Sequence, residues 1–272
     1  MRRLLAVLIT LAMAACAAPA PRRAPAPAAP AVAAAPGPPI TRAAPVNTGS
    51  WEVSADLQVR EIRPGVFLHT SWRLLADGTR FPSNGLVVRE GDGLLLIDTA
   101  WGEPATEQLL GWIDATLRLP VEHAVATHFH DDRLGGAPVL ARRGVRMVAH
   151  PLTRELAEKQ GLTVLPDVLD GLRQPGSTVT VGSAEVFYPG PGHERDNVVV
   201  WLPESRVVFG GCMMRALAAT GLGNVADADV PAWPDSVSSA AARYGTAAVV
   251  VPGHGDPGGP ELFAHTLKLL GR

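Results

Sequence analysis

The chain has 272 residues, in which 24 lysines and arginines are balanced by 26 aspartates and glutamates. This balance, with no block of basic residues, excludes the electrostatic footprint of a nucleic-acid-binding protein. Hydrophobic residues make up 47% of the chain, so it can bury a core of substantial size.

The first residues have the pattern of an export signal. Two arginines precede an apolar run at 4–15, which is shorter than the ~20 residues that a membrane-spanning helix needs. The run ends in Met13-Ala14-Ala15-Cys16, which resembles a bacterial lipobox except that Met13 stands where Leu is usual. We predict a signal peptide at 1–16 and a periplasmic location, with either an outer-membrane lipid anchor through Cys16 or ordinary cleavage near the same place.

A segment rich in Ala and Pro follows, at 17–47. Such a composition cannot bury a core, so we predict a disordered tether between an anchor and the folded part, or a tail without a role. The remaining residues, 48–272, have the length of one domain, and we expect a monomer. Their one cysteine, Cys212, would be unpaired in an oxidising compartment, and binding a metal as thiolate would protect it.

Hydrophobic patterns and turn residues divide the folded part into short strands and helices. Glu90-Gly91-Asp92-Gly93 predicts a hairpin turn, and Pro104 before leucines at helical spacing predicts a helix start. In chain order we predict strands at 66–69, 85–89 and 94–98, a helix at 104–117, a strand at 121–127, a helix at 137–142, a strand at 146–149, a helix at 152–159, strands at 177–181, 184–188, 197–202 and 207–209, a helix at 235–243, a strand at 247–251 and a helix at 260–270.

Hairpins and strand–helix units are mixed in both halves of this order. The order therefore predicts an α/β fold with two mixed β-sheets flanked by outer helices, rather than a doubly wound sheet. Residues 71–84, between the first two strands, carry Trp72, Leu74, Leu75 and Phe81. Such a loop is either a flap over a site or part of the core, and the sequence leaves both alternatives open.

Residue types that bind metals gather at the ends of four predicted strands. The first strand end carries the sequence Thr127-His128-Phe129-His130-Asp131-Asp132-Arg133. His128 and His130 point the same way in an extended chain, and Asp132 does so too unless the loop has turned. Imidazoles and carboxylates bind Zn²⁺ at roughly 2.0–2.2 Å. Three more candidates follow later strands, each beside glycine: His193, Cys212 and His254.

A polar strand end with chance histidines is the alternative explanation of this first motif. Six ligand-type residues on four strand ends favour a two-zinc hydrolase instead. The other histidines have no ligand-type neighbours, and we expect them to be structural or surface residues: His69, His123, His150 and His265.

At these motifs the chain resembles a known family, the metallo-β-lactamases of subclass B1, and most of all their VIM type. The resemblance extends from about Val66 to the C-terminus. The blocks that carry it are Thr127 to Gly136, Gly210-Gly211-Cys212, Gly223 to Asp229 with Trp233-Pro234, and Pro252 to Gly259.

The resemblance implies the metallo-β-lactamase fold, a four-layer αβ/βα sandwich, with two Zn²⁺ ions as cofactors. It implies hydrolysis of the β-lactam amide bond of penicillins, cephalosporins and carbapenems by a zinc-bound hydroxide without an acyl-enzyme, and hence antibiotic resistance. By the same resemblance, His128, His130 and His193 would hold the first zinc, and Asp132, Cys212 and His254 the second.

Two positions separate this subclass from glyoxalase-like and phosphodiesterase-like relatives. Those relatives have His and a bridging Asp where this chain has Arg133 and Cys212. Arg133 is expected to support the ligands rather than to bind a metal. The alternative functions are hydrolysis of another ester, thioester or phosphodiester on the same fold, and a zinc-holding scaffold lipoprotein without turnover.

Four residues are expected to act in catalysis or substrate binding. Asp132 would orient the hydroxide. Arg215 would pair with the β-lactam carboxylate, or is an exposed surface arginine. Asn224 would assist the lactam carbonyl or bind the carboxylate, or is a turn residue after Gly223. Trp101 would form a wall of the substrate groove, or is a packing residue.

Overall fold

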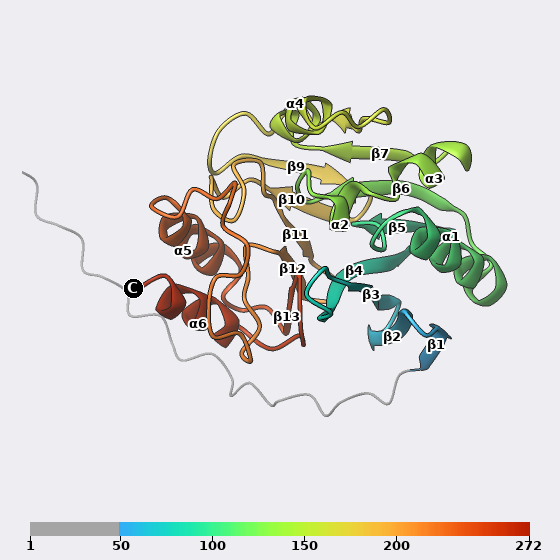
Figure 1. The fold of residues 1–272 in the computed structure, drawn as a ribbon, viewed down its shortest axis with the longest axis horizontal. Coiled ribbons are helices and arrows are strands. Elements are labelled where there is room, and N and C mark those ends of the chain that lie inside the picture. The colour runs from blue at the N-terminus through green and yellow to red at the C-terminus, as the bar shows by residue number, and fades with distance from the viewer. Residues whose placement is uncertain (1–48) are drawn as a thin grey trace, which may run out of the picture. The chain divides into compact units, whose positions relative to one another are not determined.

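A computed structural model describes residues 49–272, whose strands form two β-sheets (Figure 1). The predicted signal peptide, Cys16 and the tether at 17–47 lie outside the described residues and stay predictions. Within 49–272, none of the helices has the length and apolar character that crossing a membrane requires.

The first sheet has eight strands that lie side by side in their order along the chain. Strands β1 to β5 pair antiparallel, whereas β5 to β8 pair parallel. Parallel neighbours need a crossover, and helices occupy each crossover. The elements are β1 (Ser50–Ser54), β2 (Leu57–Arg63), β3 (Val66–Leu74), β4 (Arg80–Glu90), β5 (Gly93–Ile97), α1 (Glu103–Trp112), the π-helical turn η1 (Ile113–Leu117), β6 (Val121–Ala126), α2 (Asp131–Leu134), α3 (Ala137–Arg142), β7 (Arg146–Ala149), α4 (Pro151–Lys159) and β8 (Asp167–Val168).

The second sheet has five strands in the order β13-β12-β11-β10-β9. Its first four strands along the chain form antiparallel hairpins, and β13 returns parallel to β12 after a crossover that contains α5. The elements are β9 (Thr178–Val181), β10 (Ala184–Phe187), β11 (Val199–Leu202), β12 (Val207–Gly211), α5 (Trp233–Tyr244), β13 (Val249–Pro252) and α6 (Glu261–Leu269).

The core consists of three apolar layers, and strand β5 shows how they arise. Leu94 and Leu96 pack on the helix side of the first sheet, while Leu95 and Ile97 pack between the two sheets. Successive residues of a strand face opposite ways, so a strand that is apolar throughout is buried on both faces. The third layer lies between the second sheet and helices α5 and α6, which Figure 1 shows opposite α1 and α3. The predicted four-layer sandwich with two mixed sheets is confirmed.

The structure differs from the prediction mainly at element ends and sheet edges. The predicted helix at 104–117 is α-helical only to Trp112 and continues as the π-helical turn η1. Strands β1, β2 and β8 were not predicted, because their short, partly polar patterns become strands only through pairing with a neighbour.

Residues 71–84 form the end of a β-hairpin rather than a loose loop. Strand β3 runs to Leu74, which is 71% exposed, and β4 begins at Arg80. The hairpin therefore projects from the sheet, and Leu75 and Phe81 line a cavity at the candidate ligand residues. This arrangement supports the flap rather than the core alternative.

Candidate metal centre

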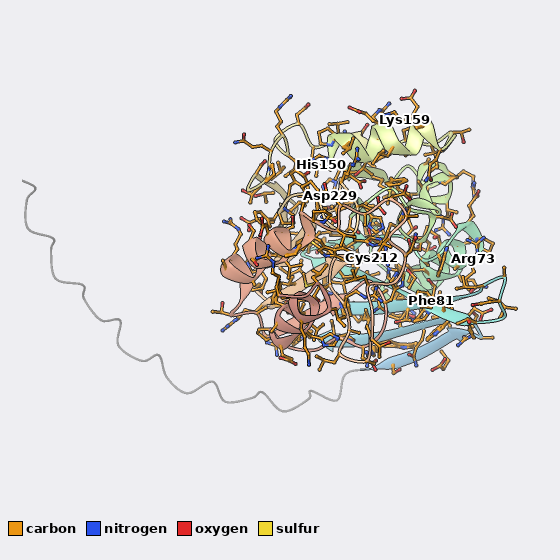
Figure 2. All side chains as sticks on the ribbon, turned by 60° about the vertical axis from the view of Figure 1, so that its left-hand side comes forward. Arg73, Phe81, His150, Lys159, Cys212 and Asp229 are labelled. Carbon is orange, nitrogen blue, oxygen red and sulfur yellow. The ribbon has the colours of Figure 1, made fainter. Side chains whose placement is uncertain are left out.

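The structure brings all six predicted ligand residues together at one edge of the sandwich. The loop and helix α2 after β6 supply the ligands from the first sheet, and the residues after β10, β12 and β13 supply those from the second. Figure 2 shows Cys212 near the centre of its view, with Phe81 and Arg73 of the β3–β4 hairpin to one side. The ligand atoms form two sets, a three-histidine group (His128, His130, His193) and a cysteine group (Asp132, Cys212, His254), each with its atoms within 4.8 Å of one another.

In the three-histidine group the rings face one another edge to face. Nε2 of His128 lies 3.2 Å from Nδ1 of His130, and the ring centroids of His128 and His193 are 5.0 Å apart. Burial, and then the neighbouring histidines, hold the pKa of His128 well below its ordinary value, so this ring is neutral. Burial also lowers the pKa of His130, but hydrogen bonding and charge from Glu194 outweigh it and raise that pKa to about 9.

The cysteine group joins the two sheets. Sγ of Cys212 lies 3.1 Å from Nε2 of His254, which in turn is 3.5 Å from Oδ2 of Asp132. Nδ1 of His254 lies 2.6 Å from the carbonyl oxygen of Pro82, which orients the ring. The loop has turned before Asp132, which is the alternative that the sequence left open: helix α2 begins at Asp131 and places Asp132 in the cysteine group.

These residues fit a bound metal ion. Both ring nitrogens of His193 are buried and have no hydrogen-bond partner among residues 49–272, which costs free energy, and a metal ion bound to the lone pair of one of them would offset part of that cost. Cys212 is buried and free, and a Cβ at Gly253 would lie only 2.6 Å from its sulfur, so glycine keeps the space beside the thiol. Imidazole, thiolate and carboxylate are the donors that protein metal sites use.

Arg133 supports the cysteine group by contacting two of its members, as the sequence predicted. Its buried guanidinium donates to Sγ of Cys212 at 3.0 Å and pairs with Oδ2 of Asp132 at 2.8 Å and of Asp98 at 3.3 Å. Burial would raise the pKa of Asp132, but the charge of Arg133 and the nearby histidines hold that pKa below its usual value. Asp132 is therefore a carboxylate, able to bind a metal or accept a proton.

Asp98 holds the histidine loop in place. Its two carboxylate oxygens accept hydrogen bonds from the backbone nitrogen and the hydroxyl of Thr127, at 2.7 and 2.8 Å. Burial raises the pKa of Asp98 to about 7, although Arg133 and Thr127 act in the opposite direction. Thr127 immediately precedes His128, so this contact fixes the start of the loop that carries the ligands.

A cavity of about 590 Å³ opens over the two groups. Its walls come from both sheets and from the β3–β4 hairpin, and three of the predicted substrate residues, Trp101, Arg215 and Asn224, line it. The hairpin contributes two apolar side chains to this lining, Leu75 and Phe81, and one cationic side chain, Arg73. A pocket with apolar walls and a few convergent polar groups is the usual form of a small-molecule site.

The three wall residues differ in how firmly they are held. Arg215 is half-buried, and its Nε donates to the carbonyl oxygen of Gly221 at 3.1 Å, so it is not a free surface arginine. Nε1 of Trp101 donates to Oδ2 of Asp131 at 3.1 Å. Asn224 is exposed, and its Oδ1 accepts from the backbone nitrogen of Ala226 at 3.1 Å, which is the turn role that the sequence left open.

Residues near the groups also include two carboxylates to which the sequence assigned no role. Oε1 of Glu194 and Oδ2 of Asp227 lie 3.1 and 3.3 Å from Nε2 of His130. Glu194 directly follows the ligand His193, but a single acidic residue in a turn has no periodicity that would mark it. The histidines expected to be structural or surface residues are absent from both groups: His69, His123, His150 and His265.

Comparison with known proteins places the chain in a family. The Metallo-beta-lactamase superfamily matches residues 78–254. The metallo-beta-lactamase type 2 of Bacillus cereus is 38% identical over 79% of this chain and 82% of its own length, and that of Bacteroides fragilis is 35% identical over 81% and 88%.

Solved structures agree with these relatives. A metallo-beta-lactamase from Hirschia baltica superposes with a TM-score of 0.77 at 33% identity, covering 79% of this chain and 98% of that one. The mono-zinc form of the FIM-1 metallo-beta-lactamase from Pseudomonas aeruginosa has a TM-score of 0.76 at 39% identity, covering 80% and 96%. The chain therefore belongs to the metallo-beta-lactamase superfamily and is an enzyme of that family.

Proposed function

We propose that this enzyme hydrolyses the amide bond of β-lactams, namely penicillins, cephalosporins and carbapenems, with two zinc ions, and thereby confers antibiotic resistance. The observation that carries the proposal is the pair of ligand groups at the base of one cavity, with the guanidinium of Arg215 in its wall. Relatives named metallo-beta-lactamase support it. We retain subclass B1 and the narrower VIM-like type as part of this proposal, on the motifs around Cys212 and Asn224.

The donor sets suit zinc better than the hard cations. Three imidazoles in one group, and a thiolate, an imidazole and a carboxylate in the other, are ligands of Zn²⁺, whereas Mg²⁺ and Ca²⁺ take oxygen ligands. Bound zinc would supply a nucleophile by lowering the pKa of water and would polarise the lactam carbonyl. No protein nucleophile and no acyl-enzyme are then needed.

The protein side chains would bind and orient the substrate. Arg215 suits the carboxylate that β-lactams carry, because a guanidinium can donate two parallel hydrogen bonds to it. Asp132, held as a carboxylate by Arg133, would orient the attacking water and accept its proton. Asn224 lines the cavity and would donate from its amide nitrogen to the lactam carbonyl, because its Oδ1 already caps a turn. Trp101 and Phe81 would exclude water from the groove.

Hydrolysis assays on ligand variants test this proposal. Cys212→Ser and His128→Ala are each expected to abolish hydrolysis of a carbapenem and a cephalosporin, because each removes a metal ligand. Chelation of the wild-type enzyme should do the same, and added zinc should restore the activity. The steady-state rate of hydrolysis, followed by the change in substrate absorbance as the lactam bond opens, measures all of these effects.

His123→Ala is the matched control, since His123 is exposed on strand β6 and belongs to neither ligand group. It should keep full activity. Full activity in metal-free protein would refute the zinc mechanism. Turnover of a glutathione thioester without turnover of any β-lactam would replace the lactamase assignment with a thioester hydrolase on the same fold.

A further inference from the structure

We propose that Glu194 is a positioning residue for the metal ligand His130. Its carboxylate would accept a hydrogen bond from Nε2–H of the ring, direct Nδ1 toward the metal and tighten metal binding by the three-histidine group. The inference rests on the metal-binding part of the proposed function and needs no assumption about the substrate.

The two ring nitrogens of His130 lie in different surroundings. Nδ1 lies 3.2 Å from Nε2 of His128 and so faces the three-histidine group. Nε2 lies 3.1 Å from Oε1 of Glu194 and 3.3 Å from Oδ2 of Asp227. Ionised carboxylates only accept hydrogen bonds, so Nε2 keeps its proton, and a metal would bind the lone pair of Nδ1 once it displaces the proton from that nitrogen.

Glu194 is the nearer and the more buried of the two carboxylates, and the contact of Asp227 also has the geometry of a hydrogen bond. Its side chain is 2% exposed, whereas that of Asp227 is 50% exposed. Burying a carboxylate costs free energy unless it is paired, and no arginine or lysine pairs with Glu194 among the residues described. Its contacts are to the ligand histidines, with Nε2 of His193 next at 3.9 Å. The fold alone gives no reason for a charge at this position, whereas a cation at the neighbouring group does.

In the other ligand histidines, the ring nitrogens that face away from the two ligand groups have neutral partners or none. Nδ1 of His254 lies against the carbonyl oxygen of Pro82, and Nδ1 of His128 lies 3.5 Å from the hydroxyl of Thr127. Within 49–272, His130 alone of the four ligand histidines has carboxylates within hydrogen-bond distance of its far nitrogen. A carboxylate there raises the basicity of a metal-bound imidazole.

Charge balance explains what this contact would do. A cation in the cysteine group would be bound by two anionic donors, the carboxylate of Asp132 and the metal-bound thiolate of Cys212, whereas three neutral imidazoles would leave the charge of a bound cation uncompensated. Glu194 supplies the missing negative charge one ring away, where low exposure keeps it from being screened by solvent. We therefore expect its effect to be confined to the three-histidine group.

The same atoms could instead hold a metal of their own, since the donors of His130, Glu194 and Asp227 also lie within 4.8 Å of one another. That arrangement would require His130 to lose its second proton and bridge two cations. A hydrogen bond from Nε2 to Glu194 needs no such deprotonation, so we argue for the hydrogen bond. A third metal ion is then an outcome that the experiment must detect.

Metal affinities of the full-length protein test the proposal. Metal-free wild type and Glu194→Gln are titrated with zinc in competition with a chromophoric chelator, and with cobalt, whose thiolate charge-transfer band reports the cysteine group separately. Glutamine keeps the shape and loses the charge. We expect Glu194→Gln to weaken the three-histidine site by about tenfold, the lower end of the effect typical for such partners, and to leave the cobalt–thiolate band unchanged.

Two further variants and a second readout sharpen the result. Asp227→Asn should weaken the same site less, because its carboxylate is half exposed. Glu204→Gln, in the exposed turn between β11 and β12, removes one negative charge elsewhere and should change neither site. In the zinc-loaded wild type, the Nε2 proton of His130 should resonate further downfield in proton NMR, and exchange more slowly, than in Glu194→Gln.

The outcomes separate this inference from the proposed function. If each site bound zinc with the same affinity in Glu194→Gln as in wild type, and the resonance of the Nε2 proton did not shift, the role of Glu194 would be overturned. The proposed zinc enzyme would not be affected by that result. A third zinc equivalent in wild type that Glu194→Gln lacks would overturn it in favour of a separate metal site. A wild-type protein that bound no zinc would overturn the proposed zinc enzyme itself.

Discussion

At the scale of single residues, the buried positive charge of Arg133 stabilises the acidic residues in and next to the cysteine group. Its guanidinium is fully buried and contacts Asp98, Asp132 and Cys212. Removing one partner from a buried charged cluster leaves the others without compensation. We therefore expect Arg133→Leu to lower the free energy of unfolding by about 3–5 kcal/mol.

Urea unfolding in one zinc-containing buffer measures this loss, and Arg142 offers the control. Arg142 pairs with Glu103 and Glu107, but its side chain is 55% exposed. Such surface pairs contribute roughly 0–1 kcal/mol, so Arg142→Ala should have a small effect. Equal losses in the two variants would show that the buried cluster is not a source of stability.

The residue scale is also where prediction from sequence succeeded most at the site. Motifs at strand ends singled out the six candidate ligand residues that the structure brings into two groups, since glycine-flanked His and Cys after apolar runs carry a local signal. Arg133 was interpretable because it stands next to a ligand. Glu194 and Asp98 act only through contacts across the fold, with His130 and Thr127, and nothing local in the sequence distinguishes them from other acidic residues.

At the scale of elements, a polar contact fastens helix α5 to the second sheet. Glu185 on β10 accepts from Nε and Nη2 of Arg243 at 3.0 and 2.7 Å, and from the hydroxyl of Tyr244 at 2.6 Å. Hydrogen bonding from Arg243 is the main cause that holds the pKa of Glu185 below its ordinary value, and burial opposes it. These charge-assisted bonds join Glu185 to two residues that lie 58 and 59 positions further along the chain.

The sign of the pH dependence follows from that lowered pKa. A carboxyl that binds its proton less readily in the folded state stabilises the fold above its unfolded pKa, and the stabilisation disappears as the pH falls through the folded value. Glu185→Gln should therefore be less stable than wild type by about 1 kcal/mol at pH 7. The difference should shrink toward zero below the usual pKa range of a glutamate. Denaturant midpoints at neutral and acidic pH check it, and a difference that grew on acidification would contradict the assignment.

Prediction at the element scale worked where strands are buried on both faces. β5, β11 and β12 are apolar runs bounded by turn residues, and their predicted positions are confirmed within a few residues. Strands β1 and β8, at the two edges of the first sheet, and β2, which pairs with the edge strand β1, have no such run. The sequence also could not decide whether residues 71–84 cover a site or pack in the core, since an apolar residue such as Leu75 suits a core and a cavity wall equally well.

At the scale of the whole molecule, the mixed order of hairpins and strand–helix units predicted two sheets, but not which strands would meet. That meeting is what makes the site. Both ligand groups take donors from each half: His128 and His130 follow β6, and Asp132 lies on α2, whereas His193, Cys212 and His254 follow strands of the second sheet. A metal bound in either group therefore ties the two halves together in the folded state and has no equivalent site in the unfolded chain.

Zinc should accordingly raise the thermal stability of the enzyme in proportion to the logarithm of its concentration. At a thousandfold excess over Kd, a ligand that binds only the folded state adds about 4 kcal/mol. For a domain of this size, each kcal/mol shifts Tm by about 2–4 °C, so we expect a rise of roughly 8–16 °C for each zinc site that is saturated. Calorimetry across a zinc series measures it. Cys212→Ser should retain only the part due to the three-histidine group, while His123→Ala should match wild type. If Tm did not change with zinc, the metal would not be bridging the two halves, and the convergence of ligands from both sheets would have no role in the stability of the fold.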